Sequence, residues 1–180
     1  MIDPDAGLLV VAGIALLFAT ASWHKWRALD EFGAIVSNYQ LAPPWAVPLL
    51  RWFVPALELG LVFALAFGPT RGIASAIAAL LLLGYAAAIA INLRRARVDL
   101  DCGCAARHAR RPIASWMVAR NVLLAALLAL AALPWAPRPL EAVDGLTVAG
   151  GVAIGALLYL AIDELLGQVV PRAAALRRPA

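Results

Sequence analysis

Both cysteines of the chain lie in one short segment, Cys102-Gly103-Cys104. A Cys-x-Cys pair can close a small disulfide ring, and the central glycine relieves the sharp bend because it has no Cβ. A strained disulfide is more easily reduced than a relaxed one. The arginine-rich stretch 94–97 would favour the reactive thiolate form of both thiols. The tripeptide therefore predicts a redox-active dithiol; the alternative is that the two cysteines are only small loop residues.

A metal site is a second interpretation of the same segment. Cys102, Cys104 and His108, with Asp101 as a further ligand, would form it, but their spacing matches no common zinc pattern. Haem attachment would need Cys-x-x-Cys-His, which the sequence lacks. We therefore expect no metal, and no cofactor is evident. A quinone would complete an electron path from the dithiol, although no residue pattern supports a quinone site.

The composition indicates an integral membrane protein. The chain has 180 residues, of which 64% are hydrophobic and 14% charged. Soluble domains carry about 45–50% apolar and about 25% charged residues, and disordered chains are poor in apolar residues. Two cysteines are too few for a disulfide-scaffolded secreted domain. The net charge is +4, and an excess of basic residues in a membrane protein usually marks its cytoplasmic loops rather than a nucleic-acid-binding surface. We therefore expect the lipid bilayer, and no nucleic acid, as a partner.

Five apolar stretches reach, or nearly reach, the length of about 20 residues that crosses a bilayer. They predict an all-α membrane protein, a bundle of four to five transmembrane helices. Pro112 suits the first turn of the fourth helix, where its missing N–H costs nothing. The fifth stretch is the weakest, because it is glycine-rich and ends near Asp163 and Glu164. The expected spans are 6–23, 45–68, 72–93, 112–133 and 146–170.

The first loop and the start of the chain each allow a further prediction. Residues 27–44 predict a short interfacial helix followed by a Pro-Pro turn. Residues 1–5 contain two aspartates and no basic residue, so we expect the first span to be retained rather than cleaved as a signal peptide.

The basic residues predict the orientation in a cytoplasmic (inner) membrane. Five spans place the first loop, the third loop and the C-terminus on one side, and that side holds most of the basic residues. The positive-inside rule then puts the Cys-Gly-Cys loop in the cytoplasm and the N-terminus outside. The side with most of the basic residues has Lys25, Arg27, Arg94, Arg95, Arg97, Arg107, Arg110, Arg111, Arg172, Arg177 and Arg178, and the other side has Arg71 and Arg138.

Glu58 and Arg120 are charged residues inside expected spans. An unpaired charge there costs about 3 kcal/mol on insertion scales. Both lie at similar depths from the cysteine side, so we expect a Glu58–Arg120 ion pair inside the bundle, helped by Asn121. The pair would act as a relay below the dithiol or would only fix helix packing. Weaker candidates on the same side are His24, Lys25 and Asn92, of which His24-Lys25 alone is typical of an interfacial anchor.

Four features resemble the MauE family of methylamine utilisation membrane proteins, within the wider DoxX-like group. The resemblance covers roughly residues 5–134, so we expect a four-helix membrane domain over 1–134 and a fifth helix with a basic tail over 135–180. One departure is Ala105-Ala106 after the second cysteine, where the family commonly has Phe-Gly. The features are Trp23-His24-Lys25, the stretch Pro55 to Gly60, Asn92-Leu93 leading to Asp101-Cys102-Gly103-Cys104, and Ala114-Ser115-Trp116 followed by Ala119-Arg120-Asn121.

The resemblance implies thiol-disulfide handling during maturation, processing or export of a partner such as the methylamine dehydrogenase light subunit. It also implies a thioredoxin-like partner of the MauD type, and makes the chain a possible component of a thiol-disulfide oxidoreductase. A cytoplasmic dithiol would lie in a reducing compartment, so it would pass reductant outward, or the charge bias misleads. The alternatives are a non-catalytic anchoring subunit that docks a partner through its basic loop, and a small transporter lined by Glu58 and Arg120.

Overall fold

The structure is a computed structural model that describes residues 3–100, 112–139 and 141–176. Cys102, Cys104 and His108 lie outside these residues, so the dithiol and metal interpretations stay predictions. The described chain folds into helices, as expected for an all-α protein. In order they are α1 (Pro4–Arg27), α2 (Leu29–Tyr39), the 3-10 turn η1 (Pro44–Ala46), α3 (Val47–Ala66), the 3-10 turn η2 (Gly68–Thr70), α4 (Arg71–Arg94), α5 (Ser115–Ala131) and α6 (Ala142–Leu176).

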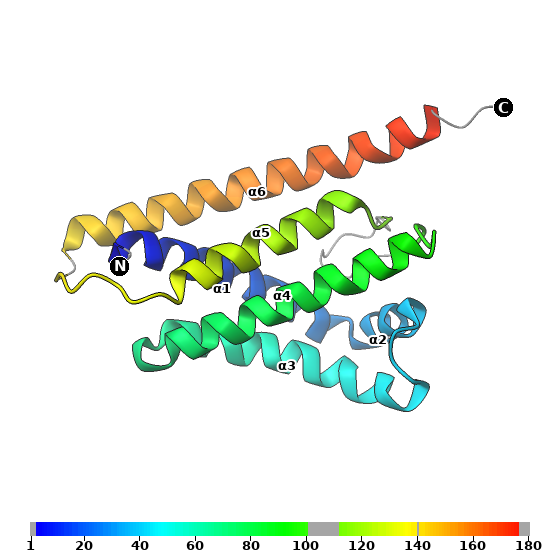
Figure 1. The fold of residues 1–180 in the computed structure, drawn as a ribbon, viewed down its shortest axis with the longest axis horizontal. Coiled ribbons are helices and arrows are strands. Elements are labelled where there is room, and N and C mark those ends of the chain that lie inside the picture. The colour runs from blue at the N-terminus through cyan, green and yellow to red at the C-terminus, as the bar shows by residue number, and fades with distance from the viewer. Residues whose placement is uncertain (1–2, 101–111, 140, 177–180) are drawn as a thin grey trace.

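The five long helices lie along one common axis, and successive long helices are antiparallel (Figure 1). α1 packs against α3, α5 and α6, and α4 packs against α3 and α5. The short α2 lies at the end of the bundle where α1 finishes, where α4 ends and where α5 begins. The start of α1 lies at the opposite end of the bundle from the end of α6. The first and third loops therefore share one end of the bundle, as the five-span prediction requires.

Within the described part of the chain, four helices are long and apolar enough to cross a membrane: Pro4–Arg27, Pro44–Ala66, Gly68–Arg94 and Ala142–Gly167. The fifth span, expected to be the weakest, is among them, and the shorter apolar helix is Ser115–Ala131. The prediction that Pro112 opens that helix is wrong. The N–H of Ile113 donates to the carbonyl of Leu100 at 3.0 Å, and Ala114 is extended, so helical geometry starts only at Ser115.

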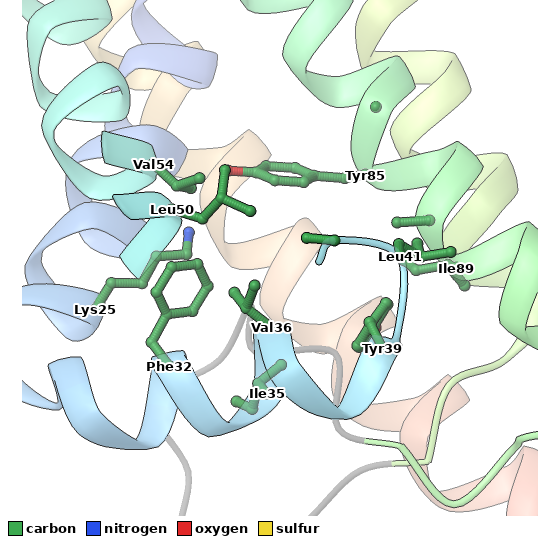
Figure 2. A pocket seen from close by; sticks show the side chains of 13 residues that line it. Lys25, Phe32, Ile35, Val36, Tyr39, Leu41, Leu50, Val54, Tyr85 and Ile89 are labelled. Atoms are coloured by element: carbon green, nitrogen blue, oxygen red, sulfur yellow. The ribbon is translucent and has the colours of Figure 1, made fainter. Parts of the chain in front are cut away.

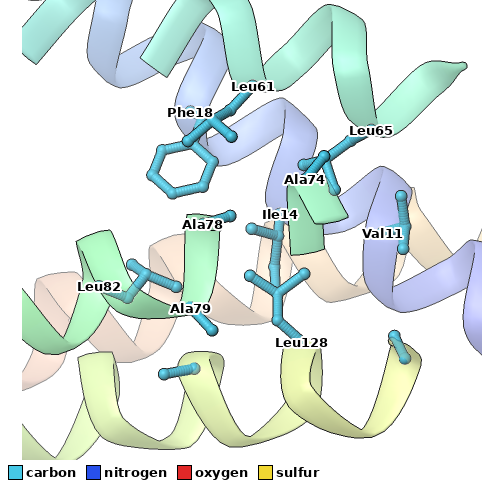
Figure 3. Close-up of a cluster of buried hydrophobic side chains, with 12 residues drawn as sticks. Val11, Ile14, Phe18, Leu61, Leu65, Ala74, Ala78, Ala79, Leu82 and Leu128 are labelled. Carbon is cyan, nitrogen blue, oxygen red and sulfur yellow. The ribbon is translucent and has the colours of Figure 1, made fainter. Parts of the chain in front are cut away.

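The main core lies between α1, α3, α4 and α5 (Figure 3). Leu65 from α3, Ala78 from α4 and Leu128 from α5 are completely buried in it. Small residues on α4 let neighbouring backbones approach closely, which is how membrane helices gain packing contacts. Gly7 serves the same purpose on α1, because a Cβ there would lie 2.6 Å from the Trp135 ring.

A second core cluster lies at the loop end of the bundle. Its buried members are Tyr39 from α2, Ile89 from α4, and Ile113 and Met117 around the start of α5. Leu100 packs against it. The cluster therefore packs α2 against Leu100 and Ile113, the residues at which the chain enters and leaves the cysteine segment. The ends of that segment are held in place by this packing.

Candidate functional site

Glu58 is a fully buried carboxylate near the middle of α3. Lys25, in the last turn of α1, donates to its Oε1 atom, and the Tyr85 hydroxyl from α4 donates to the same oxygen at 2.7 Å. Three helices thus meet at one carboxylate oxygen. The Lys25 ammonium also lies over the Phe32 ring, 5.4 Å from its centroid. Because both charges are buried, removing one partner would leave an uncompensated charge in a medium of low dielectric.

The expected Glu58–Arg120 pair is wrong. Arg120 Nη1 donates instead to Asp163 Oδ1 of α6 at 2.8 Å, and both side chains are largely buried. Asn121 does not assist either pair, because its Nδ2 donates to the carbonyl of Met117 on its own helix at 2.8 Å. The depth of a charged residue along its helix does not determine which neighbouring helix its side chain faces. Lys25 turns inward from the end of α1, and the acidic part of α6 lies beside the start of α5.

The two ion pairs nevertheless line one cavity of about 660 Å³. His24 and Asn121 line it as well, so five of the predicted site residues meet there, although Asn92 does not. The other helices contribute Tyr85 from α4 and Tyr159, Asp163 and Glu164 from α6.

A second, smaller cavity of about 340 Å³ lies between α2, α3 and α4. Figure 2 shows Lys25 and Tyr85 reaching towards each other across one end of it, above Phe32 and Val36. Lys25 and Tyr85 line both cavities. The Lys25–Glu58–Tyr85 cluster therefore forms the polar partition between them.

Asn92 belongs to the base of the cysteine loop. It is completely buried, its Nδ2 donates to the carbonyl of Ala88, and its Oδ1 accepts from Arg97 Nη1 at 3.4 Å. Arg97 Nη2 also donates to the carbonyl of Asn38 at 2.9 Å, which ties the loop to α2. The buried Asn92 amide thus helps to hold Arg97 against the bundle.

The chain leaves α4 through a tight helix end. Arg97 N–H donates to the Asn92 carbonyl and Ala96 N–H to the Leu93 carbonyl, each at 3.0 Å. Ala96 has φ 56°, the left-handed conformation that such an end requires and that glycine adopts more readily. The chain returns at Ile113, whose N–H donates to the Leu100 carbonyl at 3.0 Å. The segment between Leu100 and Ile113, which contains both cysteines, is therefore closed at its base.

Sequence reasoning missed Tyr85, Asp163 as the partner of Arg120, and Arg97 as a structural contact. A signal for Tyr85 exists in α4. The buried residues Ala78, Leu82, Ile89 and Asn92 are spaced by three, four or seven residues, and Tyr85 falls on the same helix face. A tyrosine on a buried face needs a partner for its hydroxyl, which the intramembrane Glu58 supplies.

A family model described as methylamine utilisation protein MauE matches residues 4–134. The chain is 34% identical over 167 residues to the methylamine utilization protein MauE of Methylophilus methylotrophus, an alignment that covers 92% of this chain and 88% of the relative. It is 36% identical to the MauE of Paracoccus denitrificans, with 86% of this chain and 83% of the relative covered. The MauE of Paracoccus versutus is 38% identical, with 82% and 78% covered.

No solved structure shows significant similarity to the chain. The family match extends over most of the chain, and the relatives are covered over most of their own length. Together with four helices long and apolar enough to cross a bilayer, these similarities identify a multi-pass membrane protein that belongs to the MauE family.

Proposed function

We propose that the protein is a membrane accessory protein of methylamine utilisation that exchanges thiols and disulfides with a partner. Cys102 and Cys104 would provide the dithiol, and a disulfide-containing exported protein such as the methylamine dehydrogenase light subunit would be the substrate. A thioredoxin-like protein of the MauD type would reset the dithiol. Membership of the MauE family supports the pathway, and the closed base of the cysteine loop supports the chemistry.

The observation that favours this function most is the hydrogen bond from Ile113 N–H to the Leu100 carbonyl. It holds both ends of the cysteine segment against a buried cluster at one end of the bundle. A thiol that exchanges with a partner protein must lie where that partner can reach it, and the anchored base keeps the two ends of the cysteine segment at one end of the bundle. Arg97, held by Asn92 and the Asn38 carbonyl, adds a positive charge close to the loop.

The chemistry balances without another group. One cysteine thiolate attacks the partner's disulfide, forms a mixed disulfide and releases a partner thiolate. The second cysteine then attacks the mixed disulfide, which leaves a Cys102–Cys104 disulfide and a partner dithiol. Two electrons and two protons have then passed to the partner, and the reverse sequence oxidises it.

The charge distribution supports an orientation in the cytoplasmic membrane with the cysteine loop inside. Lys25 is buried in an ion pair and does not count as a loop charge. Among the described residues, Arg27 ends α1, and Arg94, Arg95 and Arg97 lie at or just after the end of α4, at the same end of the bundle. The positive-inside rule therefore favours a cytoplasmic dithiol, from which reductant would have to pass outward to reach an exported substrate.

The test is maturation of the methylamine dehydrogenase light subunit in cells that contain Cys102→Ser or Cys104→Ser. We expect maturation to be lost while the level of the membrane protein stays normal. Normal maturation in both variants would refute the thiol function. Damage from replacing the arginines Arg107, Arg110 and Arg111 by glutamine, with silent cysteine variants, would indicate the anchoring alternative instead.

A further inference from the structure

The large cavity between α1, α5 and α6, named here the α1/α6 slot, is long and lies within the membrane-spanning lengths of α1 and α6. Its lining runs from Leu9 to Lys25 on α1 and from Gly151 to Glu164 on α6. At about 1.5 Å per residue these ranges span about 24 Å and about 20 Å. The slot therefore follows the two helices through much of the hydrocarbon region of a bilayer.

The slot exists because α6 meets the rest of the bundle at separate places. α6 lies at the edge of the bundle and packs along α1 (Figure 1). At Gly151 the two helices are close, since a Cβ there would lie 2.6 Å from Leu9 Cδ1. One turn later, at Gly155, a Cβ would meet no atom within 4 Å. Near the loop end α6 reaches α5 through the Arg120–Asp163 pair. Between these contacts the described part of the chain leaves the space beside α6 open.

Away from the loop end, the slot is lined mainly by apolar side chains that reach the outer surface of the bundle. Leu16 on α1 is 44% exposed and Leu160 on α6 is 61% exposed. The slot therefore opens sideways, towards the hydrocarbon region of the bilayer, where no water is available to fill it. The apolar lining includes Leu9, Leu16, Leu17, Leu124, Leu127 and Leu160.

The volume of the slot distinguishes a hydrocarbon chain from a protein helix. The apolar part of its lining on α1, residues 9–21, is about 18 Å long. Carbon atoms pack about 4 Å apart, so an extended hydrocarbon chain of that length needs on the order of 300 Å³. An α-helix with its side chains is about 10 Å across and would need about 1,400 Å³ over the same length. The slot, at about 660 Å³, has room for the chain and not for the helix.

The lysine and the arginine at the loop end of the slot already have protein partners. Lys25 pairs with Glu58, and Arg120 pairs with Asp163. The Arg120 guanidinium also lies over the Tyr159 ring, 5.5 Å from its centroid. Because these two cations are engaged within the protein, the part of the slot that selects a ligand is its apolar length.

We propose that the α1/α6 slot holds one acyl chain of a membrane phospholipid, which packs α6 against α1 and α5. The chain takes the place of the side chains that α6 lacks on this side, where Gly155 faces the slot. An empty slot would deprive its apolar lining of dispersion contacts on one side, and the chain restores them. This inference goes beyond the proposed function, because it uses none of the cysteine chemistry.

The glycines of α6 provide a matched pair of variants. Gly155 lines the slot and Gly150 does not, and a Cβ would meet no atom within 4 Å at either position. Both glycines are exposed on the same helix. Leucine at Gly155 should occupy the slot without a clash, whereas leucine at Gly150 should leave it open.

The experiment is a titration of the purified, delipidated full-length protein in detergent with dipalmitoyl phosphatidylglycerol, in which native mass spectrometry counts the bound lipids. We expect one tightly bound lipid for the unmodified protein and for Gly150→Leu. Gly155→Leu should weaken binding of that lipid by about tenfold, equivalent to about 1.4 kcal/mol. Equal lipid affinities of the two leucine variants would overturn the proposal.

Two comparisons on the unmodified protein test the proposal without any substitution. Dihexanoyl phosphatidylglycerol has the same headgroup but chains too short to fill the slot, so it should bind at least tenfold more weakly than the dipalmitoyl lipid. Dipalmitoyl phosphatidylethanolamine has the same chains and should bind as well as the phosphatidylglycerol. Equal binding of the short-chain lipid, or a tenfold preference between the two headgroups, would overturn the proposal, because a headgroup site would then hold the lipid. A dimer that forms as the lipid is lost, and that Gly155→Leu disrupts, would overturn it in favour of a second copy of the chain.

Discussion

Lys25 and Glu58 form a buried ion pair that joins the end of α1 to the middle of α3. Their side chains are 5% and 1% exposed. The pair also lies between the two cavities described above, because Lys25 lines both of them. It is therefore a structural tie and, at the same time, the polar boundary between these cavities.

Removal of either partner of this pair should destabilise the protein strongly. Lys25→Met leaves a buried carboxylate without its cation, and Glu58→Gln leaves a buried ammonium, each at a cost of about 3–5 kcal/mol. The double variant removes both charges and should be less damaging than the sum of the single ones. Thermal unfolding in detergent of the three variants measures this coupling.

The control for that cycle is Arg51→Gln. Arg51 pairs with Asp30 at 2.9 Å, but Asp30 is 95% exposed, and such surface pairs contribute about 0–1 kcal/mol. Its unfolding temperature should stay close to that of the unmodified protein. Strictly additive effects of Lys25→Met and Glu58→Gln would mean that the two groups do not interact.

Tyr85→Phe should have a smaller effect that depends on Glu58. The substitution removes only the hydroxyl that donates to Glu58 Oε1 at 2.7 Å, and a hydrogen bond to a charged group contributes about 1.5–3 kcal/mol. Made in the Glu58→Gln background, the same change should cost much less. An equal loss of thermal stability in both backgrounds would show that Tyr85 acts through packing alone.

The helical class and the approximate spans follow from the composition and from the lengths of the apolar stretches, because a helix that crosses a bilayer needs about 20 mostly apolar residues. The partners of the buried charges do not follow, since they depend on helix rotation. Lys25 at the end of a span is as typical of an interfacial anchor as of a buried group, and only the direction of its side chain distinguishes them. The first residue of α5 does not follow either, because the N–H of Ile113 donates to the Leu100 carbonyl and so belongs to the base of the loop.

Polar contacts hold α6 to the rest of the bundle. The 18-residue window that marks it as a candidate span is 0% buried, so packing holds it weakly. Arg120 bonds Asp163 at one end, and Arg138 bonds Asp144 at 2.9 Å and Asp5 at 2.8 Å at the other. Hydrogen bonds to Asp144 and Asp3 raise the pKa of Arg138 above its usual value.

We therefore expect the double variant Arg120→Gln/Arg138→Gln to release α6. Limited proteolysis should cleave the segment between α5 and α6 faster, while α1 to α4 stay protected. The thermal midpoint should fall by about 2–4 °C for each kcal/mol lost. Arg51→Gln again provides the control, and an unchanged proteolytic pattern would contradict the role of these contacts.

The base of the cysteine loop should control the reactivity of the thiols. Arg97→Gln removes the contacts to Asn92 and to the Asn38 carbonyl, so the loop should loosen and the reduced cysteines should react faster with maleimide. Arg94→Gln is the matched control, because Arg94 is exposed and the charge change is the same. Equal reaction rates for the two variants would show that the Arg97 contacts do not restrain the loop.

The side of the membrane on which the dithiol lies can be measured with a membrane-impermeant maleimide in intact cells and in inverted vesicles. The charge distribution predicts labelling of Cys102 and Cys104 only in inverted vesicles, without prior reduction. Position 137 lies between α5 and α6, whose connection is at the opposite end of the bundle, so Pro137→Cys in a Cys102→Ser/Cys104→Ser background should label only in intact cells. If Cys102 and Cys104 label from outside, and only after reduction, the charge-based orientation is wrong. The loop would then hold an extracytoplasmic disulfide, and direct exchange with exported proteins would need no transfer of reductant across the membrane.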